Sequence, residues 1–480
     1  MKLDQQLEYI RDVDSIVRFE CRTANCHFAT DDSCKLFKHE QSCRSETEII
    51  CKQVPMHRPS DKARLELIAE GIIPNETWYN WHFVTFDAEC FMDDVDSSRG
   101  RRSIHRLVSI GLKFSFGEKR EIYLEREDME PWSVRLLVQD FLQTLILGRS
   151  EMFKHIPTSV IEGHKRYKNI VRSKNFRHRS VQKQNDARAK LRYLNNCLAL
   201  RIYSWNGERY DHNVLWAPLM DIFANGEHGL RNMNIIRRGT GIMEFTDGSL
   251  VFRDFMNMTS PMTLEKFHKL CSKTSDKTTF PYEHFRDIGS LRNMTDFPPY
   301  KCFRSSLLQD NSVFVDELED LVTKNVTQGD WLENSVESTV NDIFQFEPPI
   351  EFEAVGEKFC VKSASRNQAL ALLHTSPKKF YESKQIFDDR CETMADYLKN
   401  YNLNDVILLE ACITSYAQHF YDTWGVNIHD KMSLPGVAQD IAFRKYDESA
   451  TAIYTFGKNF KHYNDLIRKQ LHGGMTLGSS

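Results

Sequence analysis

Carboxylate side chains recur in three separated segments of the sequence, each beside an apolar run. The first segment is Phe86-Asp87-Ala88-Glu89-Cys90, the second runs from Asn206 to Asp211, and the third runs from Tyr401 to Asp405. Two-metal hydrolysis of a phosphodiester needs about four carboxylates around two divalent ions. Four acids of these segments, Asp87, Glu89, Asp211 and Asp405, could supply them, so the sequence predicts a hydrolytic site that holds two Mg²⁺ or Mn²⁺ ions.

Local geometry explains how the first two segments would present their side chains. Alternation along a strand places Asp87 and Glu89 on one face and the residues between and before them on the other. The second segment is an apolar run followed by Asn206-Gly207, so a turn would present Asn206 and Asp211. An acid pair on a protein surface and an ordinary turn are the alternative interpretations of these two patterns taken singly.

The third segment reads as part of a helix. Tyr401 and Asp405 lie four residues apart and therefore share one helix face. The Tyr401 hydroxyl could then orient an attacking water beside a metal held by Asp405. A buried tyrosine next to an exposed aspartate is the simpler alternative for this segment alone.

An α/β fold is expected to position these residues. Apolar runs and turn signals predict strands at 82–86, 107–114, 121–124, 198–205, 234–237 and 249–252, and helices at 132–147 and 394–419. Residues 52–80, with turn signals at Pro55, Pro59 and Pro74, read as a connector.

The order of the three carboxylate segments resembles the exonuclease domain of family B DNA polymerases, most closely the protein-primed and mobile-element (Polinton-like) branch. That family carries an Asp-x-Glu strand, an Asn-x-x-x-(Phe/Tyr)-Asp turn and a Tyr-x-x-x-Asp helix. The resemblance implies a ribonuclease H-like 3′→5′ exonuclease domain over residues 80–425, acting in proofreading on a single-stranded DNA 3′ end. It implies metal binding by four carboxylates and water orientation by a tyrosine, here Asp87, Glu89, Asp211, Asp405 and Tyr401.

Two shorter patterns resemble elements of the protein-primed branch that hold the unpaired 3′ end. Thr263-Leu264-Glu265-Lys266-Phe267 resembles a Ser/Thr-Leu element, and Lys277-Thr278-Thr279-Phe280, followed by Pro281-Tyr282, resembles a Lys-x-x-apolar element. The resemblance implies that Lys277 assists catalysis and that the DNA strand contacts Asn206, Tyr210, Thr263, Leu264, Phe267 and Tyr282. Ordinary surface positions remain the alternative for Thr263 and Lys277.

Residues 430–480 resemble the start of a polymerase domain. Gly473-Gly474 resembles the family's glycine motif, which coordinates primer movement between the two active sites. No Asp-x-x-Ser-Leu-Tyr-Pro or Asp-Thr-Asp motif follows before Ser480, so we expect this chain not to polymerise DNA. A terminal protein primer and a polymerase module are the partners that the resemblance adds.

Residues 15–50 predict a small C2HC zinc-finger-like unit. The spacing is Cys-x4-Cys-x12-His-x3-Cys, which zinc would bind tetrahedrally through a hairpin and a helix near 33–41. A unit this small needs the metal to fold. The predicted ligands are Cys21, Cys26, His39 and Cys43; a coincidental cysteine cluster is the alternative.

Two charge-biased stretches interrupt the expected nuclease domain. The basic insertion, about 160–192, predicts salt-dependent phosphate contact, with Tyr167, Phe176 and Tyr193 able to stack on bases. A solvated disordered loop or a nuclear localisation signal are the other interpretations. The acidic insertion, about 305–350, reads as short helices or a mobile segment.

Composition bounds the remaining possibilities. Hydrophobic residues make up 41% and charged residues 27% of the 480, and the net charge is −4, so any basic surface must be local. The sequence lacks a signal peptide and an apolar run long enough to span a bilayer. We therefore expect no membrane partner and an intracellular location, nuclear in preference to mitochondrial.

Two other functions fit the same residues. One is a standalone exonuclease of the same superfamily, never linked to a polymerase. For either nuclease, DNA and RNA both remain open as the preferred substrate. The other is a non-catalytic nucleic-acid-binding zinc-finger protein on a nuclease-like scaffold.

Overall fold

A computed structural model describes residues 19–20, 29–30, 33–43, 52–54, 59–94, 103–117, 120–224, 233–271, 277–304, 312–327, 340, 342–373, 375–445 and 453–455. The chain divides into two compact units. One comprises Met1–Arg58 with Lys445–Ser480, and the other comprises Pro59–Arg444. Gly473 and Gly474 lie outside the described residues.

The described part of the first unit contains a strand pair and a helix. β1 (Phe19–Glu20) pairs antiparallel with β2 (Ala29–Thr30), and α2 (Ser33–Ser42) follows. A second antiparallel pair joins β3 (Lys52–Val54) to β13 (Ile453–Thr455). The predicted helix near 33–41 is confirmed, with His39 inside it and Cys43 immediately after it. Cys21 and Cys26 lie outside the described residues, so the zinc site stays a prediction.

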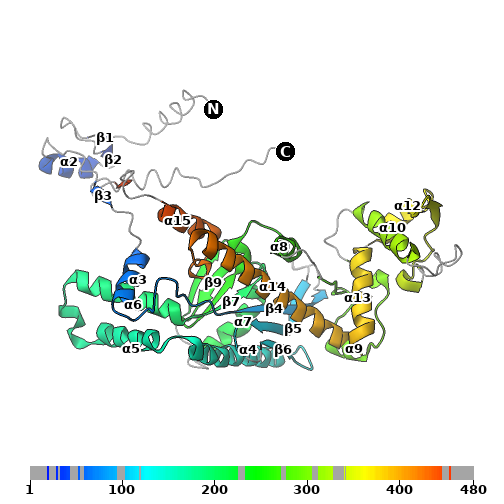
Figure 1. Ribbon diagram of the computed structural model, residues 1–480, viewed down its shortest axis with the longest axis horizontal. Coiled ribbons are helices and arrows are strands. Elements are labelled where there is room, and N and C mark those ends of the chain that lie inside the picture. Colours follow the sequence, from blue (N-terminus) through cyan, green and yellow to red (C-terminus); the bar gives the residue numbers. More distant parts are fainter. Residues whose placement is uncertain are drawn as a thin grey trace. The chain divides into compact units, whose positions relative to one another are not determined.

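A mixed seven-stranded sheet forms the centre of the second unit, which confirms the expected α/β class (Figure 1). The six predicted strands are present, and a seventh, β9, was not predicted. The sheet order is β6-β5-β4-β7-β10-β9-β8. The strands are β4 (Phe83–Asp94), β5 (Ser103–Phe114), β6 (Glu121–Glu125), β7 (Leu200–Ser204), β8 (Asn234–Arg238), β9 (Gly241–Thr246) and β10 (Leu250–Asp254).

Three neighbouring strands at the middle of this sheet are parallel. β4 pairs with β7 and β7 pairs with β10 in parallel, whereas every other pairing in the sheet is antiparallel. β7 and β10 are buried along their whole length, as expected for strands covered on both faces. Parallel strands end at the same edge, so the loops after β7 and β10 lie together.

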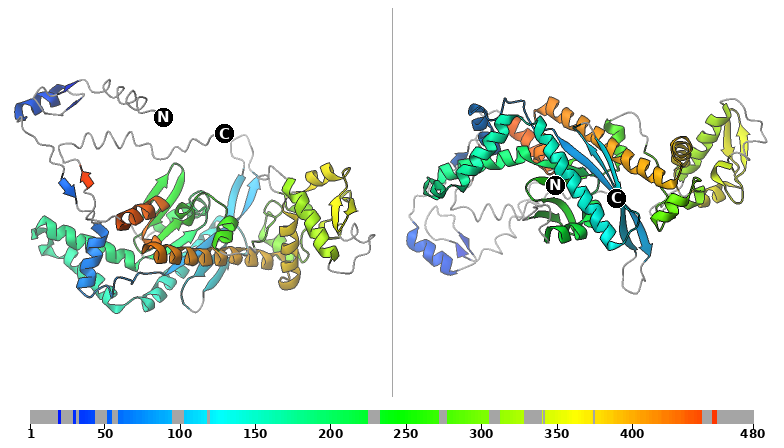
Figure 2. Two further views of the ribbon diagram at one scale, coloured as in Figure 1. Left: turned by 45° about the horizontal axis from the view of Figure 1, so that its top comes forward. Right: turned by 90° about the horizontal axis from the view of Figure 1, so that it is seen from below.

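Helices cover both faces of the sheet. The helices α4 (Pro131–Met152) and α7 (Asp211–Ala224) pack against β4 and β5 through an apolar core that contains Phe86 and Phe141. On the other face, α14 (Met394–Trp424) crosses β4 and β5, and the Thr85 hydroxyl donates to the Val406 carbonyl at 2.8 Å. Figure 2 shows the strands between α4 and α14. The predicted helices at 132–147 and 394–419 are confirmed, and both extend beyond the predicted ends.

The basic insertion folds into helices, so its interpretation as a disordered loop is wrong. It forms α5 (Thr158–Arg172) and α6 (Val181–Leu198), which pack on each other, and α6 packs on α3 (Pro59–Ala69). The predicted stacking of its aromatic rings on bases is also wrong, because Tyr167 and Phe176 are buried in the core and Tyr193 packs against that core. Residues 52–80 are likewise more than a connector, since α3 and the residues after it contribute to the same core.

The acidic insertion belongs to a subdomain with an apolar core of its own. Val315, Leu318, Phe344 and Phe380 are among its buried residues. The helix α10 (Ser312–Thr327) confirms the short-helix interpretation for the described part. The other elements of this core are β11 (Phe352–Val355), β12 (Lys358–Val361), α12 (Arg366–Leu372) and α13 (Pro377–Arg390). Three further helices of the second unit are α8 (Leu264–Cys271), α9 (Ile288–Asn293) and α15 (Leu434–Lys445).

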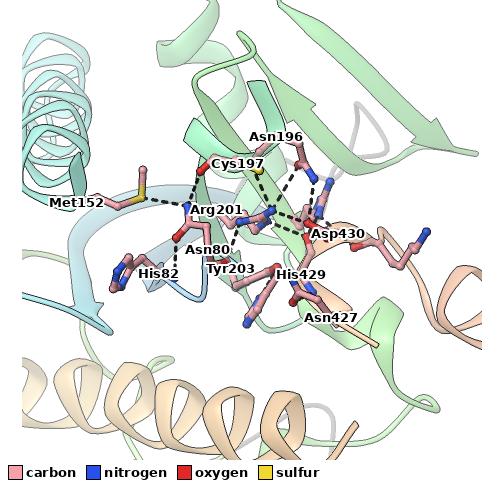
Figure 3. Close-up of polar contacts among 12 residues, drawn as sticks. Asn80, His82, Met152, Asn196, Cys197, Arg201, Tyr203, Asn427, His429 and Asp430 are labelled. Carbon is pink, nitrogen blue, oxygen red and sulfur yellow. Dashed lines mark hydrogen bonds and ion pairs between the residues drawn. The ribbon is translucent and has the colours of Figure 1, made fainter. Parts of the chain in front are cut away.

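A buried arginine ties the segment after α14 to the sheet (Figure 3). Arg201 of β7 donates to the His429 carbonyl and to the Asp430 carboxylate, each at 2.8 Å, and also to the Asn80 carbonyl at 3.3 Å. The Tyr203 hydroxyl contacts His429 Nδ1 at 3.0 Å. These bonds satisfy the arginine, which is only 1% exposed.

The helices that the structure describes include none that is both long and apolar enough to cross a membrane.

Candidate active site

Strand β4 presents Asp87 and Glu89 to the face of the sheet that α14 covers. Asn402 of α14 donates through Nδ2 to the Asp87 carbonyl and Oδ2, each at 3.2 Å, and to Glu89 Oε1 at 3.3 Å. Phe86 and Ala88 belong instead to the core on the opposite face. The predicted alternation is therefore confirmed.

Asp211 joins these acids from the start of α7. Its Oδ1 accepts the Ala88 backbone N–H at 3.3 Å, which places its carboxylate beside β4. A carboxylate in the first turn of a helix also interacts favourably with the helix dipole. The turn before it is held by Asp254, which accepts from the backbone N–H groups of Asn206 at 3.0 Å and Glu208 at 3.1 Å. Asn206 adopts a left-handed conformation with φ 64°, which asparagine tolerates.

Asp405 completes the set of four carboxylates from α14. Its Oδ2 forms an ion pair with Lys277 Nζ at 2.9 Å. Its Oδ1 is buried and has no hydrogen-bond partner among the residues that the structure describes. Tyr401 lies on the same helix face and is almost fully buried. The helix begins with a capping box between Thr393 and Asp396, which fixes the start of the helix ahead of the site.

The segment 277–282 closes one side of the cluster. The Tyr282 hydroxyl donates to Glu89 Oε2 at 2.6 Å, and its ring meets the Tyr401 ring edge-on with centroids 6.0 Å apart. The Phe280 ring packs against both Tyr282 and Tyr401 of α14. Lys277 and Tyr282, expected from a short and weak motif, therefore both contact site carboxylates directly.

The remaining predicted substrate residues have structural contacts instead. The Thr263 hydroxyl accepts the Lys266 N–H at 3.2 Å at the start of α8. Leu264 and Phe267 are buried, and the Phe267 ring stacks on Trp205 with centroids 4.9 Å apart. The Tyr210 hydroxyl contacts His105 Nδ1 at 3.0 Å. No described hydrogen bond joins Thr263, Tyr210 or the Asn206 side chain to the carboxylates, and their contact with a DNA strand stays a prediction.

The carboxylates perturb one another because they are buried together. Burial, and then the charges of Glu89 and Asp405, hold the pKa of Asp87 well above its ordinary range. Burial and the Asp87 charge likewise raise the pKa of Asp211 well above its ordinary range, and burial raises the pKa of Glu89. Burial alone would lower the pKa of Lys277, but the Asp405 charge outweighs it and the pKa is raised. The site thus concentrates negative charge that a cation would stabilise.

Asn402 was not predicted as a site residue. It is completely buried, and its amide contacts two of the four acids. Gly111 of β5, paired with Asp87, leaves room for that amide: a Cβ on Gly111 would lie 2.0 Å from Asn402 Oδ1. Helical spacing offered a signal, because Asn402 lies three residues before Asp405 and so shares its face.

Among the described residues, no three histidine, cysteine, aspartate or glutamate side chains form a ready-made metal site. The carboxylate oxygens are held by protein donors, namely the Lys277 ammonium, the Tyr282 hydroxyl, the Asn402 amide and the Ala88 N–H. The donor set nevertheless suits a hard divalent cation, because it consists of carboxylate oxygens. The orphaned Asp405 Oδ1 is one oxygen that such an ion could bind.

Comparison with known proteins adds no family to these observations. No protein-family model matches the chain, and neither a curated protein nor a solved structure matches it. The four carboxylates and the α/β sheet that carries them are therefore the basis for any functional assignment.

Proposed function

We propose that this chain is a metal-dependent 3′→5′ exonuclease that acts on a single-stranded DNA 3′ end. The observation that carries the proposal is the meeting of four carboxylates from three distant segments around strand β4: Asp87, Glu89, Asp211 and Asp405. The order of their motifs supports a ribonuclease H-like fold and a proofreading relation to family B DNA polymerases.

Two Mg²⁺ or Mn²⁺ ions would bind these four carboxylates. The raised pKa values of Asp87 and Asp211 support this assignment, because they reflect burial and then the charges of neighbouring acids, both of which a bound cation would offset. When bound, the ions supply a hydroxide nucleophile and stabilise the leaving oxygen. Binding requires the carboxylates to exchange some of their present protein donors for the metal.

The other side chains of the site act on substrate, water and carboxylates. The Tyr401 hydroxyl is proposed to orient the attacking water beside Asp405. Lys277, held 2.9 Å from Asp405, would place a positive charge near the phosphate under attack. Asn402 fixes the rotamers of Asp87 and Glu89 from α14 and acts as a positioning residue.

Zinc binding in the first unit is a separate part of the proposal. A hairpin followed by a helix with His39 and Cys43 four residues apart supports the finger interpretation. The other two ligands would be Cys21 and Cys26.

Digestion of a 5′-labelled oligonucleotide tests the nuclease proposal. With Mg²⁺ or Mn²⁺, the protein should shorten single strands from the 3′ end, and Asp87→Ala should slow this by about 10³-fold, since metal stabilisation is worth several kcal/mol. Glu127→Ala, which removes an exposed acid, is the matched control and should be unaffected. Equal release of nucleotides by Asp87→Ala and the unmodified protein would refute the assignment. Parallel DNA and RNA strands identify the preferred nucleic acid.

A further inference from the structure

The helices α5 and α6 form a hairpin that is rigidly attached to the rest of its unit. Tyr167 and Phe176 are buried on its inner side. Lys190 bonds Glu66 and Glu70 of the α3 region at 2.7 Å each. The acids next to the hairpin are thus already paired with a cation on its inner side.

The outer side of the hairpin carries cations without acidic partners. The only acid between residues 164 and 192 is Asp186, and it faces Lys62 at 3.6 Å. Nine exposed lysines and arginines have no ion pair with any residue that the structure describes. We call these nine the basic hairpin surface: Lys165, Lys168, Arg172, Lys174, Arg177, Arg179, Lys183, Arg188 and Arg192.

The helices arrange these cations in rows. Lys165, Lys168 and Arg172 follow one another at spacings of three and four residues along one side of α5. Arg188 and Arg192 lie four residues apart on α6, and the short turn between the helices carries others. A folded row of cations loses less conformational entropy on binding a repeating polyanion than a disordered loop would.

We propose that the basic hairpin surface binds the phosphate backbone of duplex DNA. The choice of a nucleic acid rests on the proposed nuclease function. The choice of duplex over single strand follows from the aromatic residues: single strands are usually held by exposed rings that stack on bases, whereas Tyr167 and Phe176 are buried. Phosphate contacts without base contacts give binding that is independent of sequence.

An anionic membrane is a weaker match for this surface. A helix that lies on a membrane needs an exposed apolar face beside its cations. Val181 is the one large apolar residue of the described hairpin that is strongly exposed. Ile161, Ile170 and Val171 pack against the core instead.

The hairpin lies away from the reacting end of the substrate. The hairpin helix α6 comes just before β7, and the turn that carries Asn206 and Asp211 comes just after it (Figure 1). The hairpin and this turn therefore lie at opposite ends of a five-residue strand. A strand of that length spans about 17 Å. The hairpin would therefore hold the double-stranded part of a substrate whose 3′ end reaches the carboxylates.

Salt-dependent binding tests this assignment. The variant Lys165→Gln/Lys168→Gln/Arg172→Gln/Arg192→Gln removes four exposed cations, and glutamine preserves helix propensity. The control removes four exposed cations elsewhere: Lys301→Gln/Arg304→Gln/Lys358→Gln/Arg390→Gln. Fluorescence anisotropy would measure affinity for a labelled duplex with a 3′ overhang from about 50 to 200 mM salt.

We expect the log–log salt slope of the hairpin variant to be shallower by about 3 to 4, since each phosphate contact contributes about 0.9. The unmodified protein would then lose about 100-fold more affinity than the variant over that salt range. The control should keep the full slope, and both proteins should digest a short single strand at the same rate. Matching slopes for variant and control, or tighter binding to phosphatidylserine vesicles than to duplex, would overturn the proposal.

The same measurements separate this inference from the nuclease proposal. If the unmodified protein binds duplex through the hairpin but releases no nucleotides, only the nuclease proposal fails. If it releases nucleotides and the two variants bind equally, only the hairpin assignment fails.

Discussion

Replacing Gly111 with alanine should disable the candidate site without touching a carboxylate. The added Cβ would lie 2.0 Å from Asn402 Oδ1 and 2.9 Å from Asn402 Cγ, well inside an ordinary van der Waals contact of 3.4–4 Å. The Asn402 amide must therefore move by more than 1 Å. Its hydrogen bonds to Asp87 and Glu89 would break or lengthen, and both carboxylates would lose their present orientation.

Two magnitudes follow for Gly111→Ala. Overpacking of a buried position costs about 1–3 kcal/mol of unfolding free energy. Displacement of catalytic groups by about 1 Å costs on the order of 10²-fold in rate. Urea unfolding and the 3′-end digestion assay measure the two effects separately.

Gly163→Ala is the matched control for Gly111→Ala. A Cβ on Gly163, a buried residue of α5, would lie 2.3 Å from Ile72 Cγ2 in the core and away from the carboxylates. We expect a comparable loss of stability with an unchanged rate for the folded protein. The double variant Gly111→Ala/Asn402→Ala removes the clash and should regain stability but not activity. Full activity of Gly111→Ala at the stability of Gly163→Ala would refute a positioning role for Asn402.

Three further predictions concern charge and metal. Because the Asp87 pKa is raised in the folded protein, the stability that its neutral form contributes is lost as pH rises through that pKa. In the presence of a chelator, Asp87→Asn should therefore melt at a higher temperature than the unmodified protein, and the difference should grow with pH. Added Mg²⁺ should reverse the order of the two melting temperatures. A melting difference that does not depend on pH would contradict this. Asp430→Ala removes an acceptor of the buried Arg201, and the Asp430 side chain is 24% exposed. We expect the free energy of unfolding in urea to fall by about 2–3 kcal/mol with an unchanged m-value. A fall of less than about 0.5 kcal/mol would show that the ion pair is dispensable for stability. Cys43→Ser should abolish stoichiometric zinc in elemental analysis of the purified protein, and retention of one zinc per chain would exclude Cys43 as a ligand.

The parts of the fold set by local pattern could be predicted from the sequence. Asp87 and Glu89 alternate with apolar residues, and Tyr401 and Asp405 share a helix face, so side-chain periodicity alone placed them. The strand β7 was predicted equally well, because it lies within the largely apolar run 198–205, and all of its residues are buried. Strand β9, in contrast, carries Gly241 and Glu244 within six residues, and its apolar signal is too weak to separate it from a loop.

Features that depend on distant partners could not be predicted. The apolar positions of α5 and α6 are diluted by lysine and arginine, so the core positions of Tyr167 and Phe176 emerge only once α3 packs beside them. Asn402 had the right spacing, but its importance depends on the absence of a side chain at Gly111, far away in sequence. Tyr282 was predicted as a substrate contact, which stays a prediction, and its hydrogen bond to Glu89 depends on a strand residue 193 positions earlier in the chain.

The separation of the site residues along the chain has a consequence for synthesis of the protein. Asp87 and its partner Asn402 are 315 residues apart, so β4 is made long before α14 can cover it. At about 5–20 residues per second, a ribosome needs roughly 15–60 s to bridge that interval. During that time the nascent chain carries first two and then three acids of an unfinished site and lacks Asp405. If the proposed nuclease is right, a ribosome-bound chain cannot cut nucleic acid until α14 has emerged, and activity would begin only with completion of the fold.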